Sequence, residues 1–546
     1  MRTQGDPNDI LIALRLGCGV AQSKVPSRRN HLRSIHRLVI HAFLVLVVSG
    51  VGIAAGAHSD LYVSTSGDDS NPGTIEKPLQ TIQHAADVAK PGDTINLRAG
   101  TYCQQLAVKV SGNAEQGFIT FRSQPGEHAI LDGGCLTPPA GESNMVRLTN
   151  VSFVRIEDLE IRNYRTSDFG SVPGGIRVFG GGSHIEILHN NVHHIEQNSP
   201  RRLRPGSGAN GFGISVYGTS ATTPISDLVI DGNDVHHLKT GSSESLVVNG
   251  NVAGFRITKN TVHDNNNIGI DVIGFEHTAP DPAVDRARDG VVSENLVYSI
   301  TARGNPAYGE TPDSDGIYVD GGTRILIERN VIHDADFGIE LASEHRVGST
   351  SHIIARNNLI YSCHAPGFAI GGYDEKRGTT EDVVIVNNTL YKNDTWKTGQ
   401  GEVLMQFYMR NNVFKNNIVY IGDHGLAMTS KSGRMDGAAP TVTMDHNIYY
   451  FPSGSKAVKW SFDTKNYSSF EEYVAGSGND QKSQFADPQF VDVDAHDFHL
   501  KPDSPALSSG EDLGSEIVGD RDLDDRPRFN GKEVGIGCYE MRSQTK

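Results

Sequence analysis

An asparagine-bearing motif recurs along most of the chain and constrains the fold more than any other feature. In each copy, apolar and polar residues alternate before the Asn, and an apolar residue with His or Tyr follows it. The copies are 27–42 residues apart and place Asn at Asn191, Asn233, Asn260, Asn295, Asn330, Asn358, Asn388 and Asn417. Self-similarity at such a period is typical of a solenoid, in which each repeat packs against its neighbours.

Each copy predicts a short β-strand. In IEILHNNVHHI (185–195) and ILIERNVIHDA (325–335) the apolar positions alternate and β-branched residues dominate, as in a strand with one buried face. No apolar stripe of helical period spans a copy. A second strand occurs in each coil, as in IGIDVIGFE (268–276) and DGIYVDGG (315–322), and we expect a third. The sequence therefore predicts an all-β parallel solenoid of roughly ten or more coils.

The recurring Asn follows the strand, at the point where the chain must turn. An Asn amide can bond the backbone of a turn, and Asn tolerates a left-handed backbone conformation. In stacked coils these side chains would form a ladder in which each amide satisfies the next.

The ends of the chain differ from its centre. Residues 1–57 carry seven Lys or Arg and two Asp, then an apolar run that ends in A-x-A, so we expect a signal peptide and export; an uncleaved membrane anchor is the alternative. We expect an N-terminal cap with a short helix and the first coils in residues 58–135. The central β-helix then occupies residues 136–450, and the last coils and a closing segment occupy residues 451–546.

Net charge and cysteine content indicate which binding partners and cross-links to expect. The whole chain carries a net charge of -16, which argues against non-specific nucleic-acid binding, and we expect a monomer. Four cysteines remain after export, of which Cys103 and Cys135 are about one or two coils apart and form the favoured disulfide. The sequence contains no C-x-x-C pair, so we do not expect a structural zinc site.

Both ends of the solenoid resemble a known family. Three parts of the chain are similar to pectin-lyase-like right-handed parallel β-helix proteins. They are the opening YVSTSGDDSNPGT with KPLQTIQHAADVAKPGDTINLRAGTY, the Asn-bearing coils, and the ending DPQFVD, DFHLKPDSPAL and VGIGCYE. The resemblance covers residues 61–540 and implies a secreted, carbohydrate-active protein with a single-stranded right-handed parallel β-helix. It leaves the reaction open, because this fold hosts lyases, hydrolases, epimerases and adhesins.

Carboxylates gather in the second strand set. Aligned on their Gly-Ile steps, these strands give an outward column that reads Ser215, Val247, Asp271, Tyr318, Glu340 and Ala369. Asp320 lies one coil and two residues from both Asp271 and Glu340, a backbone separation of roughly 8 Å. Such acids suit glycoside hydrolysis, in which one carboxyl is the acid and another the base or nucleophile.

The coils DGIYVDGG and GIELASEH are also similar to β-helix glycosidases that set an Asp on one coil and a Glu on the next. On that resemblance Asp320 is the nucleophile or base, Glu340 or Glu344 the acid, and Asp271 a supporting group. The expected substrate is a polysaccharide or oligosaccharide. The residues expected to bind it are Glu276, His277, Tyr318, His345, Arg346 and Tyr373.

Three alternatives remain open. The first is a polysaccharide lyase or uronate epimerase, with Arg303, Arg324 or Arg346 as base because no lysine lies between Lys259 and Lys376. The second is a non-catalytic carbohydrate-binding protein. The third concerns cofactors: the sequence assigns none, but Asp271, Asp315 and Asp320 could share Ca²⁺. The segment HDNNNIGID (263–271) resembles the calcium coil of polysaccharide lyase family nine, but has Asn where that family has Asp.

Overall fold

The computed structural model describes residues 59–200, 209–431, 442–530 and 533–541. The predicted signal peptide lies outside these residues. No helix in the described ranges is long and apolar enough to cross a bilayer.

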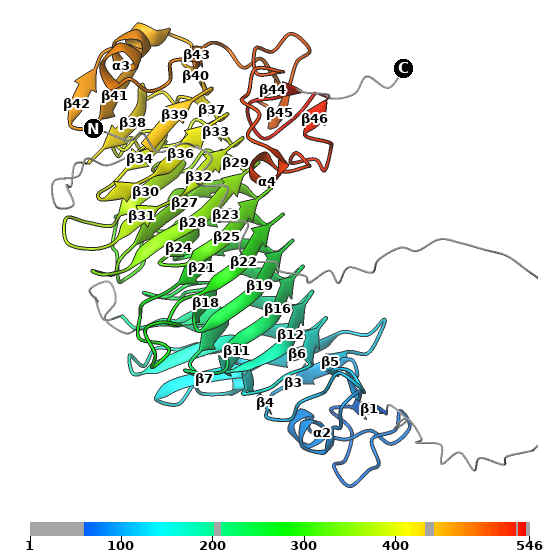
Figure 1. Ribbon diagram of the computed structural model, residues 1–546. Helices are drawn as coiled ribbons and strands as arrows, with labels where there is room; N and C mark the ends of the chain where they lie inside the picture. Colours follow the sequence, from blue (N-terminus) through cyan, green and yellow to red (C-terminus); the bar gives the residue numbers. More distant parts are fainter. Residues whose placement is uncertain (1–58, 201–208, 432–441, 531–532, 542–546) are drawn as a thin grey trace, which may run out of the picture. The chain divides into compact units, whose positions relative to one another are not determined.

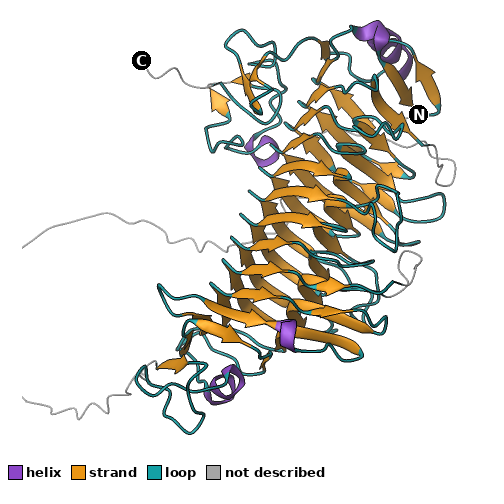
Figure 2. Cartoon of the chain, turned by 180° about the vertical axis from the view of Figure 1, so that it is seen from behind, coloured by secondary structure: helices purple, strands orange, loops and turns teal. Residues whose placement is uncertain are grey.

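Three long sheets of stacked strands make up most of the described chain (Figures 1 and 2). Sheet 1 has the order β1 (Asp60–Val63), β2 (Thr94–Leu97), β5 (Ile119–Ser123), β8 (Val154–Glu157), β12 (Gly182–Leu188), β16 (Ile225–Asp231), β19 (Val252–Thr258), β22 (Arg288–Ser293), β25 (Thr323–Glu328), β28 (Ser349–Arg356), β32 (Val384–Val386), β36 (Asn412–Lys415) and β39 (Val442–Asp445), with β31 (Thr379–Glu381) and β35 (Met409–Arg410) beside it. Sheet 2 has the order β3 (Gly100–Tyr102), β6 (Ala129–Asp132), β9 (Glu160–Arg162), β13 (Asn191–His193), β17 (Asp234–His236), β20 (Thr261–Asn265), β23 (Leu296–Ile300), β26 (Val331–Ala335), β29 (Leu359–Tyr361), β33 (Thr389–Tyr391), β37 (Ile418–Tyr420), β40 (Ile448–Tyr450) and β43 (Gln484–Phe485). Sheet 3 has the order β4 (Leu106–Val108), β7 (Gly141–Thr149), β11 (Ser171–Gly180), β15 (Phe212–Gly218), β18 (Leu246–Gly250), β21 (Ile270–Ile273), β24 (Asp315–Asp320), β27 (Phe337–Ser343), β30 (Phe368–Gly372), β34 (Val403–Met405), β38 (Leu426–Ser430), β41 (Lys459–Phe462) and β42 (Lys465–Tyr467).

Each central coil gives one strand to each sheet. In one coil β25 belongs to sheet 1, β26 to sheet 2 and β27 to sheet 3, and each pairs in parallel with its equivalent in the next coil. The expected third strand is therefore present. It lies inside the recurring motif itself, immediately after the Asn, so that one motif contains two strands and the turn between them.

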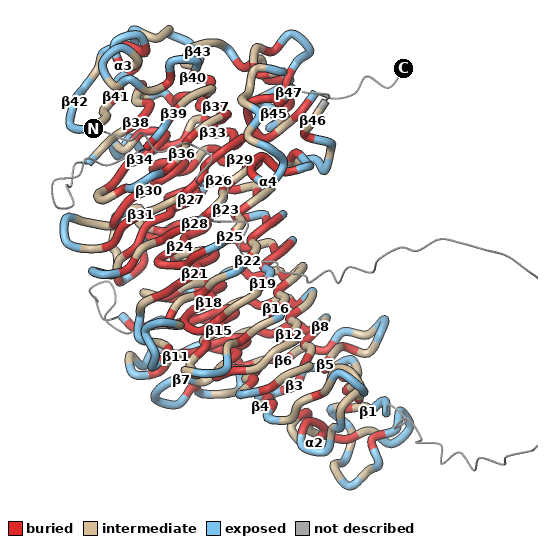
Figure 3. The backbone as a smooth tube through the Cα atoms, in the orientation of Figure 1, coloured by how far each residue is buried: buried red, intermediate tan, exposed pale blue. Residues whose placement is uncertain are grey.

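Alternation along these strands explains the core. Ile325 and Ile327 of β25, Ile332 of β26 and Ile339 of β27 are at most 2% exposed and belong to one apolar cluster. Burying such a side chain stabilises the fold by about 1.5–3 kcal/mol relative to leaving it in water. In Figure 3 the strands are accordingly mostly buried, whereas many of the connecting loops are exposed.

The predicted asparagine ladder is present at the turn between sheets 1 and 2. Within it, Asn330 Nδ2 donates to Asn358 Oδ1 at 2.9 Å and to the carbonyl of Val292 at 3.0 Å, while Asn330 Oδ1 accepts from the backbone and side chain of Asn295. The same pattern joins all the buried members, which are Asn190, Asn233, Asn260, Asn295, Asn330, Asn358, Asn388, Asn417 and Asn447.

Two details of the ladder differ from the prediction. The first member is Asn190 and not Asn191, whose side chain instead contacts His236. The left-handed backbone belongs to the residue before each ladder Asn, as at Lys259 (φ 55°) and Arg329 (φ 55°), so the Asn itself keeps an ordinary conformation. The turn residue and the amide that satisfies the turn are therefore two different positions.

In three coils the residue before the ladder Asn is also Asn, and it holds the C-terminal segment. Asn357 Nδ2 donates to the carbonyl of Val518 at 2.9 Å, Asn387 Nδ2 to that of Gly535 at 2.7 Å, and Asn416 Nδ2 to that of Glu511 at 2.9 Å. This second row of buried amides fixes residues 511–540 along the turns of the last coils. The segment contains α4 (Ser515–Val518), β46 (Phe529–Asn530) and β47 (Glu533–Val534), and follows β44 (Phe490–Asp492) and β45 (Asp497–Leu500).

The remaining elements are short. Helix α2 (Ile82–Val88) begins after Thr81, whose hydroxyl accepts the His84 N–H, and it contacts β1, β2 and β4. That α2 caps the stack stays a prediction. Helix α3 (Phe470–Ser477) contacts β41 and β42, and β10 (Arg165–Thr166) pairs with β14 (Glu196–Gln197). The predicted disulfide between Cys103 and Cys135 is present.

Candidate active site

A cavity of about 480 Å³ lies over sheet 3 and is lined mainly by acids. Strands β21, β24 and β27 form its floor, and loops before and after these strands complete its walls. Eight carboxyl groups line it: Glu244, Asp271, Glu276, Asp313, Asp315, Asp320, Glu340 and Glu344. The strand acids among them are at most 7% exposed.

The strand register brings the predicted acids together. Asp271 pairs with Tyr318, and Tyr318 pairs with Glu340, so the whole predicted column from Ser215 to Ala369 is confirmed. Asp320 lies two residues beyond Tyr318 on β24 and reaches the same cavity. The backbone separation between Asp320 and either neighbouring acid follows from the strand spacing and is roughly 8 Å.

Asp320 is held by two groups on the next coil. Its Oδ1 accepts the backbone N–H of Glu344 at 2.7 Å, and its Oδ2 lies 3.2 Å from His345 Nε2. Burial opposes the protonation of His345, but the hydrogen bond and the charge of Asp320 outweigh it and raise the pKa of the imidazole. The two contacts fix the direction of the Asp320 carboxylate within the cavity.

Glu340 and Glu344 lie in surroundings that favour the protonated form of each side chain. Burial, helped by the charge of Asp313, raises the pKa of Glu340 to about 7, although Asp315 and Gln406 bond its carboxylate. Burial and the charge of Asp320 raise the pKa of Glu344 to about 8, against the attraction of Arg377, whose Nη1 lies 3.4 Å away. One cavity therefore contains a firmly oriented carboxylate and two acids that retain protons near neutral pH.

Several polar atoms in the cavity are buried and have no hydrogen-bond partner within the described part of the protein. They are Asp271 Oδ1, Asp315 Oδ1 and the Tyr318 hydroxyl. Burial, followed by the charge of Glu244, raises the pKa of Asp271 well above its usual range. Unpartnered buried polar groups are costly, so these atoms are arranged for a ligand that supplies the missing hydrogen bonds.

Four titratable residues of the cavity were missed at the sequence level. Glu244 and Asp313 precede β18 and β24 in loops, and burial raises their pKa values to about 8 and about 6. Tyr308 lies in the insertion between β23 and β24, and Arg377 lies in the turn after β30. The available signal was position: each falls in a loop directly before or after a strand that carries a predicted acid or its neighbour.

Not every predicted site residue lines the cavity. Glu276, Tyr318, His345 and Tyr373 do, whereas His277 and Arg346 are exposed and lie outside its lining. The arginines considered as lyase bases are also placed elsewhere. Arg303 pairs with Glu310 at 2.8 Å and Arg324 with Asp289 at 2.6 Å, both at exposed positions.

The calcium hypothesis finds no matching geometry. A shared ion requires ligand atoms that lie close together. In the described ranges, Asp271, Asp315 and Asp320 do not form a group whose ligand atoms all lie within 4.8 Å of one another. Ca²⁺ takes six to eight oxygen ligands that converge on one point. These three carboxylates therefore do not fit a shared calcium ion as they stand.

Comparisons with known proteins agree with the fold. A family model described as a right handed beta helix region matches residues 174–455, and one described as Pel9A-like, right handed beta helix region matches residues 61–216. The chain is 39% identical over 451 residues to the uncharacterized protein YwoF of Bacillus subtilis, covering 83% of this chain and 92% of YwoF. It is 35% identical over 121 residues to pectate lyase PEL9 of Emericella nidulans, covering 22% of this chain and 29% of that protein.

Two solved structures align with the chain at low sequence identity. Pectate lyase Pel9A aligns with a TM-score of 0.46 and 14% identity, covering 89% of this chain and 98% of that one. The GH136 lacto-N-biosidase of Eubacterium ramulus aligns with a TM-score of 0.45 and 16% identity, covering 72% and 64%. This chain belongs to the family of right-handed parallel β-helix proteins.

Proposed function

We propose that the acidic cavity hydrolyses glycosidic bonds of a polysaccharide or oligosaccharide, and that the chain is exported to meet this substrate. The observation that carries the proposal is the pairing of an oriented carboxylate, Asp320, with acids of raised pKa, Glu340 and Glu344, in one cavity. Glycoside hydrolysis needs one protonated carboxyl and one carboxylate on either side of the scissile bond.

In this mechanism Glu340 or Glu344 donates a proton to the leaving-group oxygen. Asp320 then either takes a proton from the water that attacks the anomeric carbon or attacks that carbon itself. His345 keeps the Asp320 carboxylate in place through the contact at Oδ2. Asp271 Oδ1 and the Tyr318 hydroxyl have no hydrogen-bond partner in the described part of the chain and are positioned to bond sugar hydroxyls.

The lyase alternative is supported by the Pel9A-like model, but that match ends at residue 216, before every residue that lines the cavity. A lyase base must also remove a proton beside an anionic uronate carboxylate. The cavity offers eight carboxyls and, among its lining residues, no lysine and one arginine, Arg377. With so little positive charge to pair with its carboxylate, a uronate is disfavoured relative to a neutral or amino sugar.

The test is a panel of neutral, amino-sugar and uronate polysaccharides, read for reducing ends and for the ultraviolet absorbance of unsaturated uronates. We expect reducing ends without absorbance, and a loss of at least about 10²-fold in kcat for Asp320→Asn and Glu340→Gln. Asp289→Asn and Glu294→Gln are matched controls, because both acids lie in exposed ion pairs outside the cavity. Absorbing products, or full activity of both cavity variants, would overturn the proposal.

A further inference from the structure

Sheet 2 carries a column of stacked rings on its outer face, away from the acidic cavity. Neighbouring ring centroids lie 4.7–5.1 Å apart along His193, His236, His263, Tyr298, His333 and Tyr361. The residue after each ring has a left-handed backbone, as at His194 (φ 54°), His237 (φ 52°) and Asp264 (φ 53°). This conformation interrupts the alternation of a strand, so two consecutive side chains come together on one side.

The consecutive side chains are close enough to share a bound ion. His236 Nδ1 lies 2.7 Å from His237 Nδ1, and His263 Nδ1 lies 2.6 Å from Asp264 Oδ2. One ligand atom from each of His237, His263 and Asp264 can be chosen so that all three lie within 4.8 Å of one another. His237, directly after β17, and His263 and Asp264 of β20 on the next coil thus bring two imidazoles and one carboxylate to a single point.

A second set of contacts lies behind these groups. The other ring nitrogen of His263, Nε2, lies 3.1 Å from Asp234 Oδ1. His236 Nε2 similarly lies 3.0 Å from Asn191 Oδ1. Histidines that bind metals usually have their second nitrogen bonded to a carboxylate or an oxygen acceptor, which fixes the ring and makes the free nitrogen a better ligand.

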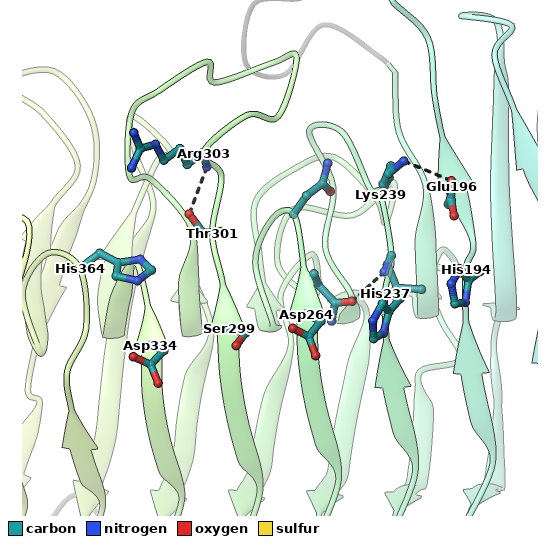
Figure 4. A pocket seen from close by; sticks show the side chains of 13 residues that line it. His194, Glu196, His237, Lys239, Asp264, Ser299, Thr301, Arg303, Asp334 and His364 are labelled. Carbon is teal, nitrogen blue, oxygen red and sulfur yellow. Dashed lines mark hydrogen bonds and ion pairs between the residues drawn. The ribbon is translucent and has the colours of Figure 1, made fainter.

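The site is open to solvent. His237 and Asp264 line a pocket of about 640 Å³ that runs across the end of sheet 2, and the Asp264 side chain is 43% exposed. Figure 4 shows His194, His237 and Asp264 side by side on neighbouring strands at its wall. An ion can therefore reach His237 and Asp264 from this pocket and keep water in its remaining positions, whereas the His263 ring lies deeper, at 14% exposure.

We propose that His237, His263 and Asp264 form a binding site for one divalent transition-metal ion of the zinc type, with Asp234 positioning His263. Two imidazole nitrogens, one carboxylate oxygen and space for water form a donor set that Zn²⁺ accepts. Ca²⁺ and Mg²⁺ prefer oxygen ligands throughout. The site is separate from the acidic cavity on sheet 3, so the bound ion joins neighbouring coils and takes no part in the proposed hydrolysis.

The test is calorimetric titration of the untagged, chelator-treated protein with Zn²⁺ alone. We expect one saturable site per chain, and affinity at least tenfold weaker in His237→Ala and in Asp264→Asn. His333→Ala is the matched control: His333 Nδ1 lies 2.8 Å from Asp334 Oδ2, but its neighbouring coils carry Tyr298 and Tyr361 in the ring column. This control should bind Zn²⁺ like the unaltered protein.

Co²⁺ provides a second readout, because its visible absorption reports tetrahedral coordination by nitrogen and oxygen. We expect such bands in the unaltered protein and their loss in His237→Ala, with circular dichroism confirming that the variant is folded. Three results would each overturn the proposal: no saturable Zn²⁺ binding, unchanged affinity in both ligand variants, or equal weakening by His333→Ala.

Discussion

Replacing one ladder asparagine, Asn330→Ala, tests how much the coils depend on their shared amides. The side chain is fully buried, accepts the backbone N–H of Asn295 at 3.0 Å, and donates to the Val292 carbonyl at 3.0 Å. The Asn295 side chain keeps its bond to the Ile257 carbonyl, and Asn358 Oδ1 keeps the Asn330 backbone N–H. The substitution therefore leaves two main-chain groups without their partner, at about 1–3 kcal/mol each, so we expect a loss of about 2–6 kcal/mol.

The assay is urea unfolding followed by far-ultraviolet circular dichroism, analysed by the midpoint and slope of the transition. Asn191→Ala is the matched control, because Asn191 adjoins the ladder in sequence and its side-chain oxygen contacts only the half-buried His236 ring. We expect this control to cost less than about 1 kcal/mol. If Asn330→Ala unfolded at the same urea concentration as the control, the ladder would not be a main source of stability.

Three further predictions concern the cavity and the disulfide. Burial raises the pKa of Glu340 to about 7 and of Glu344 to about 8, so these two groups bind more protons in the folded chain than in the unfolded one between about pH 5 and pH 8. Their contribution to stability should fall as the pH rises, and Glu344→Gln should make the pH dependence of thermal melts less steep. Tyr318→Phe should raise stability by about 1 kcal/mol in urea unfolding, because the hydroxyl is buried without a partner, and should weaken sugar binding in the polysaccharide assay. Reducing or mutating the Cys103–Cys135 bridge, which spans 32 residues, should cost about 3–4 kcal/mol, measured as a lower urea midpoint than that of the oxidised protein. A flat pH profile would refute the first prediction, and a Tyr318→Phe variant with unaltered sugar affinity would refute the second. An unchanged urea midpoint on reduction would refute the third.

Much of the fold follows from local patterns. The alternation of apolar residues predicts the strands of sheets 1 and 3, because one face of each strand must enter the core. The third strand of each coil was expected but its position was not located, because the strands of sheet 2 are as short as three residues, as in β29, and merge with the preceding strand in a single motif. The shift from Asn191 to Asn190 has a similar origin, since two adjacent asparagines fit one pattern and only the register between coils separates them.

The site was predictable where it lies on strands and not where it lies on loops. Asp271, Tyr318 and Glu340 share one column because parallel register is fixed by the buried neighbours on the same strands. Glu244 and Arg377 enter the cavity through loops, whose lengths differ from coil to coil and whose paths no strand period specifies. The exposed positions of His277 and Arg346 illustrate the same limit, because both follow the end of a strand.

The second row of asparagines has a consequence for how the protein is made. Asn357 is bonded to a carbonyl 161 residues later in the chain, and Asn387 to one 148 residues later. A ribosome therefore releases these coils long before the segment that covers their amides has been synthesised. During that interval water is the hydrogen-bond partner of these amides, and the main-chain carbonyls of the C-terminal segment replace it in the finished protein.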